Sequence, residues 1–462
     1  MTTLKPRIYL MIEGKKRELD ARIYFSLKAS LKNYSVVLAA KPKLFDNRKR
    51  MQKGIIIFKS IGRGYYKQIL EYKKLGFIVG SIDEEGMMYF SDEEYTQRIF
   101  KPCLDELDIF FCWGQKDYNA IANKFPEFKE KMYIMGNSRM DILKKPLNKK
   151  YLEVAKKIKE VHGSFVLINT MFTKVNNYQL IKMKQGYIDA LIKDGNDPKS
   201  EKVRLAKIYL VFQKENLNSL KMFIAEYSKK NLNKKIIIRP HPGEDSDMWT
   251  EFAKNMNNVK VIIDDQSTNS WIIAADKCIT SNCTTSLESY LLDKISANYL
   301  FYRNEEVEFK IPKLVSYNVH NEPELIDFIE SKKDLNLDKI FINNIMKKSI
   351  NNFEDSSCSV ENFFKYLNQN EKIKNKLKNS EKDKLSGRFY LIILNIYFYI
   401  RFIYRKLFTK QNKIWSKFLT KKFDRIDEKE IERTLKLYKD YLNIKEKIVI
   451  KEIYPQVFKI EN

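Results

Sequence analysis

The chain has little of what secretion, zinc binding or dinucleotide binding would require. It contains only five cysteines, Cys103, Cys112, Cys278, Cys283 and Cys358, and none of them forms a C-x-x-C pair. We therefore expect reduced thiols and no zinc site. The glycines at 62 and 64 do not belong to a G-x-G-x-x-G motif, so no nicotinamide cofactor is expected.

Long apolar runs are also missing. No uninterrupted apolar run approaches the ~20 residues that a membrane-spanning helix needs. The first 20 residues pass directly from a short apolar segment to charged residues, and no signal peptide is visible. We therefore expect the protein to be made and kept on the cytoplasmic side.

Positive charge is what the chain has in excess. There are 85 Lys and Arg against 59 Asp and Glu, a formal net charge of +26, which calls for an anionic partner. A hydrophobic content of 44% over 462 residues describes a folded protein with room for two or three domains.

Half of this excess lies near the C-terminus. Residues 372–422 hold 15 Lys and Arg and two acids, and 15 − 2 gives +13. Within them an aromatic apolar core, 389–400, is flanked by Arg388 and Arg401 and is about half the ~20-residue spanning length. This pattern predicts a helix in the headgroup plane, with membrane contact through Gly387–Lys422. A buried core helix with a basic outer face is the alternative.

Short apolar segments alternate with helical ones along most of the chain. We expect strands at 7–12, 35–40, 54–58, 76–82, 108–113, 133–135, 164–169, 235–238, 259–263, 277–280 and 297–301. Such alternation predicts an α/β fold with two doubly wound Rossmann-type domains facing each other across a cleft. The expected domains are 1–150 and 151–330. Return helices at 331–370 and a basic amphipathic helical tail at 371–462 would follow.

Three of these strands end in residues that could carry chemistry. The strand at 235–238 runs into Arg239, Pro240 and His241, one of only three histidines. In open α/β sheets the ligand lies beyond the carboxyl ends of the strands, where Arg239 and His241 could donate to a phosphate. The alternative is a strand-exit turn whose histidine has only a structural role.

The other two strand ends are acidic and hydroxyl-rich. Asp83, Glu84 and Glu85 follow one strand, and crowding of like charges raises the pKa of at least one carboxyl toward the range of a general base. Ser281–Ser286 enters a helix that carries Glu288, and hydroxyls with backbone amides can bind an anion without a metal. A solvated acidic loop and simple helix capping are the alternatives.

The order of these segments resembles a known family. Arg17-Glu18-Leu19-Asp20, Asp83-Glu84-Glu85-Gly86, Trp113-Gly114, Gly136–Asp141, Arg239–Glu244 and Ser281–Glu288 are similar to motifs of bacterial surface carbohydrate biosynthesis proteins. More distantly they resemble GT-B glycosyltransferases that use CMP-activated sugars, the sialyltransferases and Kdo transferases. The resemblance covers about residues 7–301. Ser138 stands where the family has proline, which is a minor departure.

The resemblance implies that domain 1–150 lies on the acceptor side and domain 151–330 on the nucleotide-donor side, and it implies roles for particular residues. Glu85 would be the general base, with Glu84 and Asp83 as runners-up, and Arg239 and His241 would hold the donor phosphate. The other residues expected at the donor site are Asn169, Thr170, Ser281, Thr284, Thr285, Ser286 and Glu288. Those expected on the acceptor side or in the cleft are Glu13, Lys15, Arg17, Glu18 and Arg139. No metal and no cofactor is expected.

The sequence therefore predicts a glycosyltransferase of bacterial surface polysaccharide, capsule or O-antigen, synthesis. It would transfer a sugar with inversion from a nucleotide-activated, CMP-type donor to a glycan or lipid-linked glycan, as a peripheral protein on the inner face of the plasma membrane. A CDP-glycerol transferase of the teichoic-acid type and a UDP-sugar epimerase are rivals. A non-catalytic nucleic-acid-binding protein is the rival from another class, although the position of the charge beside an aromatic block disfavours nucleic acid.

Overall fold

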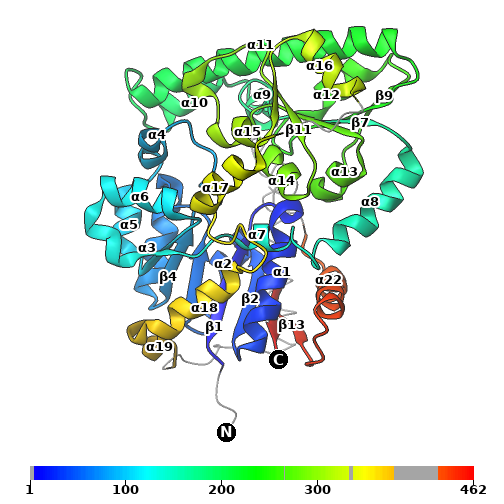
Figure 1. Ribbon diagram of the computed structural model, residues 1–462. Coiled ribbons are helices and arrows are strands. Elements are labelled where there is room, and N and C mark those ends of the chain that lie inside the picture. The colour runs from blue at the N-terminus through cyan, green and yellow to red at the C-terminus, as the bar shows by residue number, and fades with distance from the viewer. Residues whose placement is uncertain (1–4, 265, 332–336, 379–424) are drawn as a thin grey trace, which may run out of the picture. The chain divides into compact units, whose positions relative to one another are not determined.

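The chain folds into two compact units, each built around one sheet (Figure 1). The computed structural model describes residues 5–264, 266–331, 337–378 and 425–462. Unit 1 comprises residues 1–87, 95–147 and 345–462, and unit 2 comprises residues 88–94 and 148–344. The predicted α/β class with two largely parallel sheets is confirmed. The predicted cleft concerns how the units face each other and stays a prediction.

Unit 1 contains an eight-stranded sheet in the order β13-β14-β2-β1-β3-β4-β5-β6. Its first six strands in the chain are parallel: β1 (Arg7–Ile12), β2 (Ser35–Ala40), β3 (Ile55–Phe58), β4 (Ile78–Ile82), β5 (Ile109–Cys112) and β6 (Met132–Ile134). Residues in β1 to β5 are buried throughout, as expected for parallel strands covered on both faces. The strand order reverses between β1 and β3, which is where open sheets of this kind bind ligands.

Helices cover both faces of this sheet. They are α1 (Lys15–Leu31), α2 (Lys41–Asn47), α3 (Tyr66–Lys74), α5 (Lys101–Glu106), α6 (Gln115–Lys124), α7 (Ser138–Asp141), α18 (Ser359–Gln369), α19 (Glu371–Lys378) and α22 (Glu428–Tyr441). Two more, α4 (Asp92–Gln97) and α17 (Lys339–Ser349), lie where the chain passes from one unit to the other.

The end of the chain differs from the helical tail expected over 371–462. After α22 it forms a hairpin of β13 (Val449–Tyr454) and β14 (Val457–Glu461), and β14 pairs antiparallel with β2. The backbone N–H and C=O groups at the edge of β2 need hydrogen-bond partners, and β14 supplies them. This need arises from the tertiary structure, so the local composition of residues 371–462 does not reveal it. The membrane segment expected at Gly387–Lys422 lies outside the described residues.

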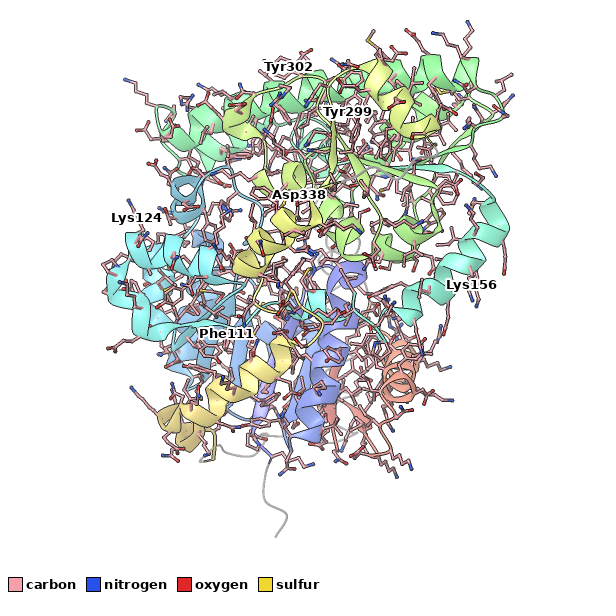
Figure 2. The ribbon with its side chains drawn as sticks, in the orientation of Figure 1. Phe111, Lys124, Lys156, Tyr299, Tyr302 and Asp338 are labelled. Carbon is pink, nitrogen blue, oxygen red and sulfur yellow. The ribbon has the colours of Figure 1, made fainter. Side chains whose placement is uncertain are left out.

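Helix α18 returns the chain to the face of the sheet that α1 covers. The ring of Phe363 lies 5.1 Å from that of Phe25 in α1 and 5.3 Å from that of Phe111 in β5, which Figure 2 labels. The preceding loop is held by Asn352, whose Oδ1 accepts from Asn137 N at 2.9 Å. Its Nδ2 donates to Asn137 O at 2.9 Å and to Asp141 Oδ1 at 2.6 Å. The loop can approach because position 136 is glycine: a Cβ there would lie 2.2 Å from Asn352 Oδ1.

Unit 2 contains a six-stranded, entirely parallel sheet in the order β12-β11-β10-β7-β8-β9. Its strands are β7 (Val166–Asn169), β8 (Ile236–Arg239), β9 (Val259–Val261), β10 (Lys277–Thr280), β11 (Ser296–Tyr299) and β12 (Tyr317–Val319). The order reverses between β7 and β10, so the second ligand position expected for the fold lies at their ends.

The helices of unit 2 include one of 30 residues, α11 (Glu201–Lys230), which packs Leu220, Phe223 and Ile224 into the core over β7 and β8. The others are α8 (Lys149–His162), α9 (Tyr178–Lys182), α10 (Tyr187–Lys193), α12 (Ser246–Ala253), α13 (Thr268–Ala274), α14 (Thr285–Leu291), α15 (Lys310–Val315) and α16 (Glu322–Glu330). Within the described ranges, no helix is long and apolar enough to cross a bilayer.

The Asn352 contact yields a stability prediction. Replacing Asn352 with Ala leaves the buried amide and carbonyl of Asn137 and one oxygen of Asp141 without this partner, so we expect a loss of about 3 kcal/mol in the free energy of unfolding. The matched control is Asn351→Ala, because Asn351 is exposed and contacts Trp113 only through its backbone N–H. We expect it to change stability by less than about 0.5 kcal/mol. Equal unfolding midpoints in urea for the two variants would contradict this role.

Candidate functional site

The carboxyl ends of the unit 1 strands carry a network of charged side chains. Glu13 follows β1, Lys59 follows β3, and residues 83–85 follow β4, while α7 after β6 carries Arg139. Helix α1, which begins beside them, adds Arg17, Glu18 and Arg22 to the same edge, as the ion pairs below show. The parallel topology therefore collects, at one edge, groups that lie far apart in the sequence.

Glu84 is the buried centre of this network. Its carboxylate accepts from Arg22 Nη2 at 2.6 Å and Asn137 Nδ2 at 3.1 Å, and Arg139 Nη1 lies 3.9 Å away. Burial acts to raise its pKa, but the attraction of Arg22 and Arg139 outweighs burial and lowers the pKa to about 2. Glu84 is thus an ionised structural carboxylate and not a proton acceptor at neutral pH.

Glu85 is held differently. Its side chain is 46% exposed, and its Oε1 lies 2.8 Å from Arg17 Nη1. Against the opposing effect of burial, this arginine lowers the pKa of Glu85. A carboxylate with a lowered pKa accepts a proton weakly, so the geometry does not favour Glu85, the first choice from the sequence, as a general base.

Asp83 is the remaining carboxyl, and its environment raises its pKa, whereas the environments of Glu84 and Glu85 lower theirs. It is 9% exposed, and burial raises its pKa to about 6, with Arg98 opposing the rise. Its Oδ1 accepts from Glu85 N at 3.2 Å, and its carbonyl accepts from Gly86 N at 3.0 Å and Trp113 Nε1 at 2.7 Å. Three consecutive carboxyls therefore have separated pKa values, with Asp83 nearest to neutral.

Gly86 is needed to close the turn that presents Asp83. A Cβ at position 86 would lie 3.0 Å from the carbonyl oxygen of Asp83 and 3.4 Å from the indole of Trp113. The sequence motif of acids followed by glycine is therefore a tight turn packed against an indole ring.

The residues expected on the acceptor side do not all lie in the network. Glu13 accepts from the Tyr65 hydroxyl at 2.7 Å and Lys59 Nζ at 3.0 Å, and Lys59 also lies 3.3 Å from Glu18. Lys15 instead pairs with Glu430 of α22 at 2.7 Å. Sequence reasoning missed Lys59, Tyr65 and Arg22. Lys59 had a detectable signal, because it directly follows a buried strand.

In unit 2, three neighbouring strands end in register. Thr280 of β10 pairs with Asn169 of β7, and Asn169 pairs with Arg239 of β8. The chain segments that follow them carry Thr170, His241 and Ser281, and neighbouring strands lie about 4.8 Å apart. The structure thus brings the ends of these three strands together at the reversal point of the sheet.

His241 is held in one tautomer. Its Nδ1 accepts a hydrogen bond from Gly243 N at 3.0 Å, so the proton of the neutral ring is carried by Nε2. The ring is half-buried and follows the end of β8. Its Nε2–H is a neutral hydrogen-bond donor, which suits a phosphate oxygen.

Glu244 fixes the loop that carries this histidine. It is 1% exposed and accepts from Thr170 Oγ1 at 2.8 Å, Phe172 N at 2.9 Å and Trp249 Nε1 at 2.8 Å. Burial raises the pKa of Glu244, and the donated hydrogen bonds oppose that rise. It ties the loop after β7 to the loop after β8. Thr170, expected to line the phosphate site, is therefore committed to Glu244.

Arg239 also has a partner of its own. Its Nη2 donates to Asp264 Oδ1 at 2.8 Å and to the Gln266 carbonyl at 3.0 Å, and its guanidinium lies 5.2 Å from the centre of the Trp271 ring. The side chain is 10% exposed, and burial lowers its pKa. Arg239 therefore anchors the loop after β9, and the expected phosphate contact would compete with Asp264.

The hydroxyl-rich turn after β10 is mostly turned inward. Ser286 shares a hydrogen bond of 2.7 Å with Thr280, and Ser281 donates to the carbonyl of Tyr299 at 3.3 Å. Thr285 is buried and lies 3.4 Å from the thiol of Cys283, while Thr284 is half-buried at the N-terminus of α14. Glu288, in the first turn of α14, is half-buried. Of the four hydroxyls expected to bind an anion, those of Ser281, Thr285 and Ser286 are on buried residues, and that of Thr284 is on a half-buried one.

Comparisons with known proteins found likeness only among solved structures, since no family model and no curated protein matches the chain. The UDP-GlcNAc 2-epimerase of Methanocaldococcus jannaschii, in complex with UDP-GlcNAc and UDP, is 14% identical. The match covers 79% of this chain and 100% of that chain, with a TM-score of 0.47. The Neisseria meningitidis epimerase bound to UDP-GlcNAc is 11% identical over 79% and 100% of the chains, with a TM-score of 0.46.

The wall teichoic acid polymerase TagF is similar to the same extent. It is 12% identical over 81% of this chain and 90% of its own, with a TM-score of 0.47. All three proteins are enzymes. At these identities and TM-scores the likeness carries no argument about the activity of this chain, which depends on its own residues.

The separated pKa values yield opposite pH effects on stability. Asp83 has a raised pKa, so the native state binds more protons than the unfolded state between about pH 4 and pH 6. The free energy of unfolding therefore falls by about 3 kcal/mol as the pH rises through that range. Asp83→Asn removes this fall, so the variant gains stability relative to the wild type as the pH rises. Urea unfolding at a series of pH values measures it.

Glu84→Gln is the matched control, because the pH dependence of stability that Glu84 contributes is opposite to that of Asp83. The lowered pKa of Glu84 gives stability that is present above the unfolded pKa and is lost as the pH falls toward about 2. At neutral pH we expect the variant to lose about 3 kcal/mol, because Arg22 keeps a buried charge without its partner. Parallel pH profiles for the two variants would contradict the assignment.

Proposed function

We propose that the chain is a transferase that moves a sugar from a nucleotide-activated donor to a hydroxyl acceptor in bacterial surface polysaccharide synthesis. The observation that carries the proposal is the arrangement of three consecutive carboxyls after β4: Glu84 pairs with Arg22 and Glu85 with Arg17, whereas Asp83 is buried, and this separates their pKa values. A carboxyl with a near-neutral pKa, beside two carboxylates held ionised by arginines, is the arrangement that general base catalysis uses.

In the proposed reaction, Asp83 takes the proton of the acceptor hydroxyl, and the acceptor oxygen attacks the anomeric carbon of the donor sugar. The bond from that carbon to the nucleotide phosphate oxygen breaks, and the phosphate keeps the electron pair. His241 Nε2–H donates to this phosphate and stabilises the charge that develops on it. Attack from the face opposite the leaving group inverts the anomeric centre.

Unit 2 would bind the donor at the ends of β7, β8 and β10. Support comes from the fixed tautomer of His241, the reversal of strand order between β7 and β10, and the register that aligns Asn169 with Arg239. We favour a CMP-sugar as the donor on the motif resemblance described above, and transfer without a metal. The acceptor would be a glycan or a lipid-linked glycan reached at the inner face of the plasma membrane.

The proposal is tested by the nucleotide that the enzyme releases. Purified protein is incubated with a glycan acceptor and, separately, with CMP-sugars, UDP-sugars and CDP-glycerol, and with EDTA in a parallel series. Release of CMP with formation of a glycoside, unchanged by EDTA, is expected. Release of CMP from CDP-glycerol alone would assign polyol-phosphate transfer instead, and conversion of a UDP-sugar without an acceptor would assign epimerisation.

His241 provides the matching binding prediction. In His241→Gln the amide N–H of the glutamine reaches about the position of Nε2, so donor affinity should fall by no more than about threefold. In His241→Asn the shorter side chain can accept from Gly243 but cannot reach the phosphate, and we expect a loss of about tenfold or more. Calorimetric titration with the released nucleotide measures both variants, and equal losses would show a purely structural role.

A further inference from the structure

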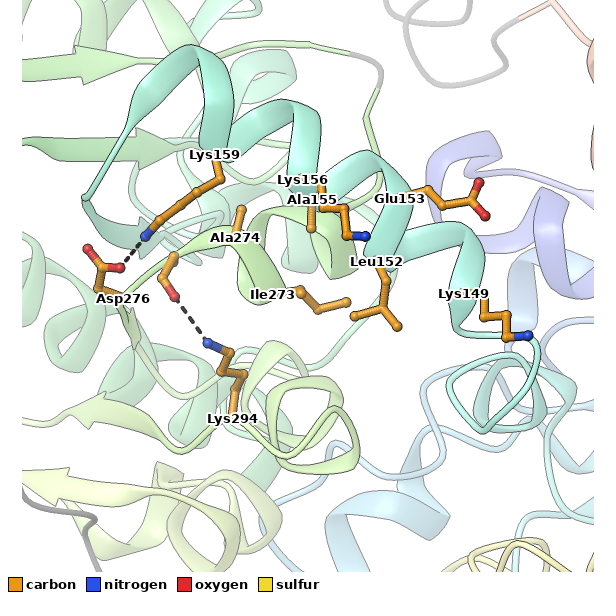
Figure 3. A pocket seen from close by; sticks show the side chains of 11 residues that line it. Lys149, Leu152, Glu153, Ala155, Lys156, Lys159, Ile273, Ala274, Asp276 and Lys294 are labelled. Atoms are coloured by element: carbon orange, nitrogen blue, oxygen red, sulfur yellow. Dashed lines mark hydrogen bonds and ion pairs between the residues drawn. The ribbon is translucent and has the colours of Figure 1, made fainter.

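Unit 2 has a groove whose lining contains none of the candidate donor-site residues. It has a volume of about 560 Å³, within the usual range of ligand pockets, and lies between α8 and the end of α13 (Figure 3). The residues that line it are Lys149, Leu152, Glu153, Ala155, Lys156, Lys159, Ile273, Ala274, Ala275, Asp276 and Lys294.

The groove lies away from the strand ends that carry His241 and Asn169. Asp276 directly precedes β10, and Lys294 lies two residues before β11, so both belong to the amino-terminal edge of the sheet. His241 and Asn169 lie at the carboxyl-terminal edge. A ligand in this groove is therefore distinct from the nucleotide donor.

One stripe of α8 forms a wall of the groove. Tyr151, Ala155 and Ile158 are buried in unit 2, whereas Leu152, Lys156 and Lys159 follow at helical spacing on the adjoining face. The side chain of Leu152 is 40% exposed and, in Figure 3, extends toward Ile273. With Ala155 and Ala274, these two residues make an apolar floor beneath the lysines.

The charged side chains around this floor differ in whether they have a partner of opposite charge. Asp276 is bound by Lys159 and by the hydroxyl of Ser164, so its charge is balanced. Lys294 Nζ donates to the Ala275 carbonyl at 3.4 Å, which holds its ammonium group at the groove without neutralising it. Lys156 has no hydrogen-bond or ion-pair partner among the described residues. The ammonium groups of Lys156 and Lys294 thus have no acidic partner among the described residues at the groove, whose remaining charged lining residues are Lys149 and Glu153.

We propose that this groove binds the phosphate headgroup of an anionic lipid at a bilayer surface. Lys156 and Lys294 would contact the phosphate, and Leu152 and Ile273 would contact the glycerol and the first methylenes of the acyl chains. Lysines beside exposed apolar side chains are the pattern of interfacial lipid contact. The net charge of +26 supports attraction to an anionic surface.

A ligand without an apolar portion fits less well. Inorganic phosphate would leave Leu152 and Ile273 in contact with water, and the groove offers no aromatic ring on which a base could stack among its described lining residues. The proposal does not depend on the donor chemistry proposed for the strand ends.

The test uses the whole chain and vesicles of phosphatidylcholine with or without phosphatidylglycerol. Co-sedimentation is measured for Lys156→Glu, Lys294→Glu and the double variant. Each lysine near an anionic surface raises the partition coefficient onto the vesicles about fivefold. We therefore expect the double variant to bind anionic vesicles at least about 25-fold more weakly than the wild type. Vesicles of phosphatidylcholine alone should bind all of these proteins weakly and equally.

The matched control is Lys157→Glu, which makes the same charge change at the next residue of α8. Lys157 is exposed and does not line the groove, so its reversal should weaken binding by less than about twofold. Any contribution from residues 387–422 is common to all variants and cancels in the comparison. Nucleotide release with a soluble acceptor should be unchanged in every variant, which separates this result from the donor chemistry.

Two results would overturn the proposal. One is binding of the double variant to anionic vesicles as tightly as that of Lys157→Glu, with both proteins folded by circular dichroism. The other is binding of free inorganic phosphate that requires Lys156 and Lys294 while vesicle binding does not.

Discussion

The buried carboxylate of Glu84 is the constraint on which the unit 1 site depends. It joins α1 through Arg22 to α7 through Asn137 and Arg139, so it fixes the turn in which Asp83 and Glu85 lie on either side of it. A buried charge of this kind is costly unless every lone pair finds a donor, and Glu84 has donors on both oxygens. Unit 2 has a similar buried acidic residue. Glu244 accepts hydrogen bonds on both oxygens and holds the loop that carries His241. In each unit the residue proposed to act in the reaction is a near neighbour of this buried acidic side chain.

Parallel sheet topology explains why these residues gather where they do. Both sheets reverse strand order at their centre, between β1 and β3 in unit 1 and between β7 and β10 in unit 2. At the first reversal point Glu13 forms an ion pair with Lys59, and at the second Asn169 pairs in register with Thr280. The lysine-lined groove beside α8 lies at the opposite edge of the second sheet, so the proposed donor site and the proposed lipid contact use different residues.

Much of the fold was predictable, because short apolar segments bounded by polar turns specify buried strands. The bounds of β1 and β2 match the prediction, and the acidic stretch and the histidine lie at strand ends as expected. The different environments of Asp83, Glu84 and Glu85 were not predictable, since that of Glu84 depends on Arg22, which is 62 residues away, and on Asn137, which is 53 residues away. The inward bonds of Ser286 and the partner of Arg239 depend on tertiary packing in the same way. The hairpin β13–β14 was missed because its partner, β2, lies more than 400 residues earlier.

The most direct test of the account is the pH dependence of turnover in two isosteric variants, Asp83→Asn and Glu85→Gln. If Asp83 is the base, wild-type kcat/KM rises with pH through about 6, where the carboxyl loses its proton. Asp83→Asn should then lower kcat by about 10²- to 10⁴-fold without changing nucleotide affinity. Glu85→Gln should keep most of the activity and the same inflection. Loss of turnover in Glu85→Gln, with near-normal activity in Asp83→Asn, would contradict the central claim.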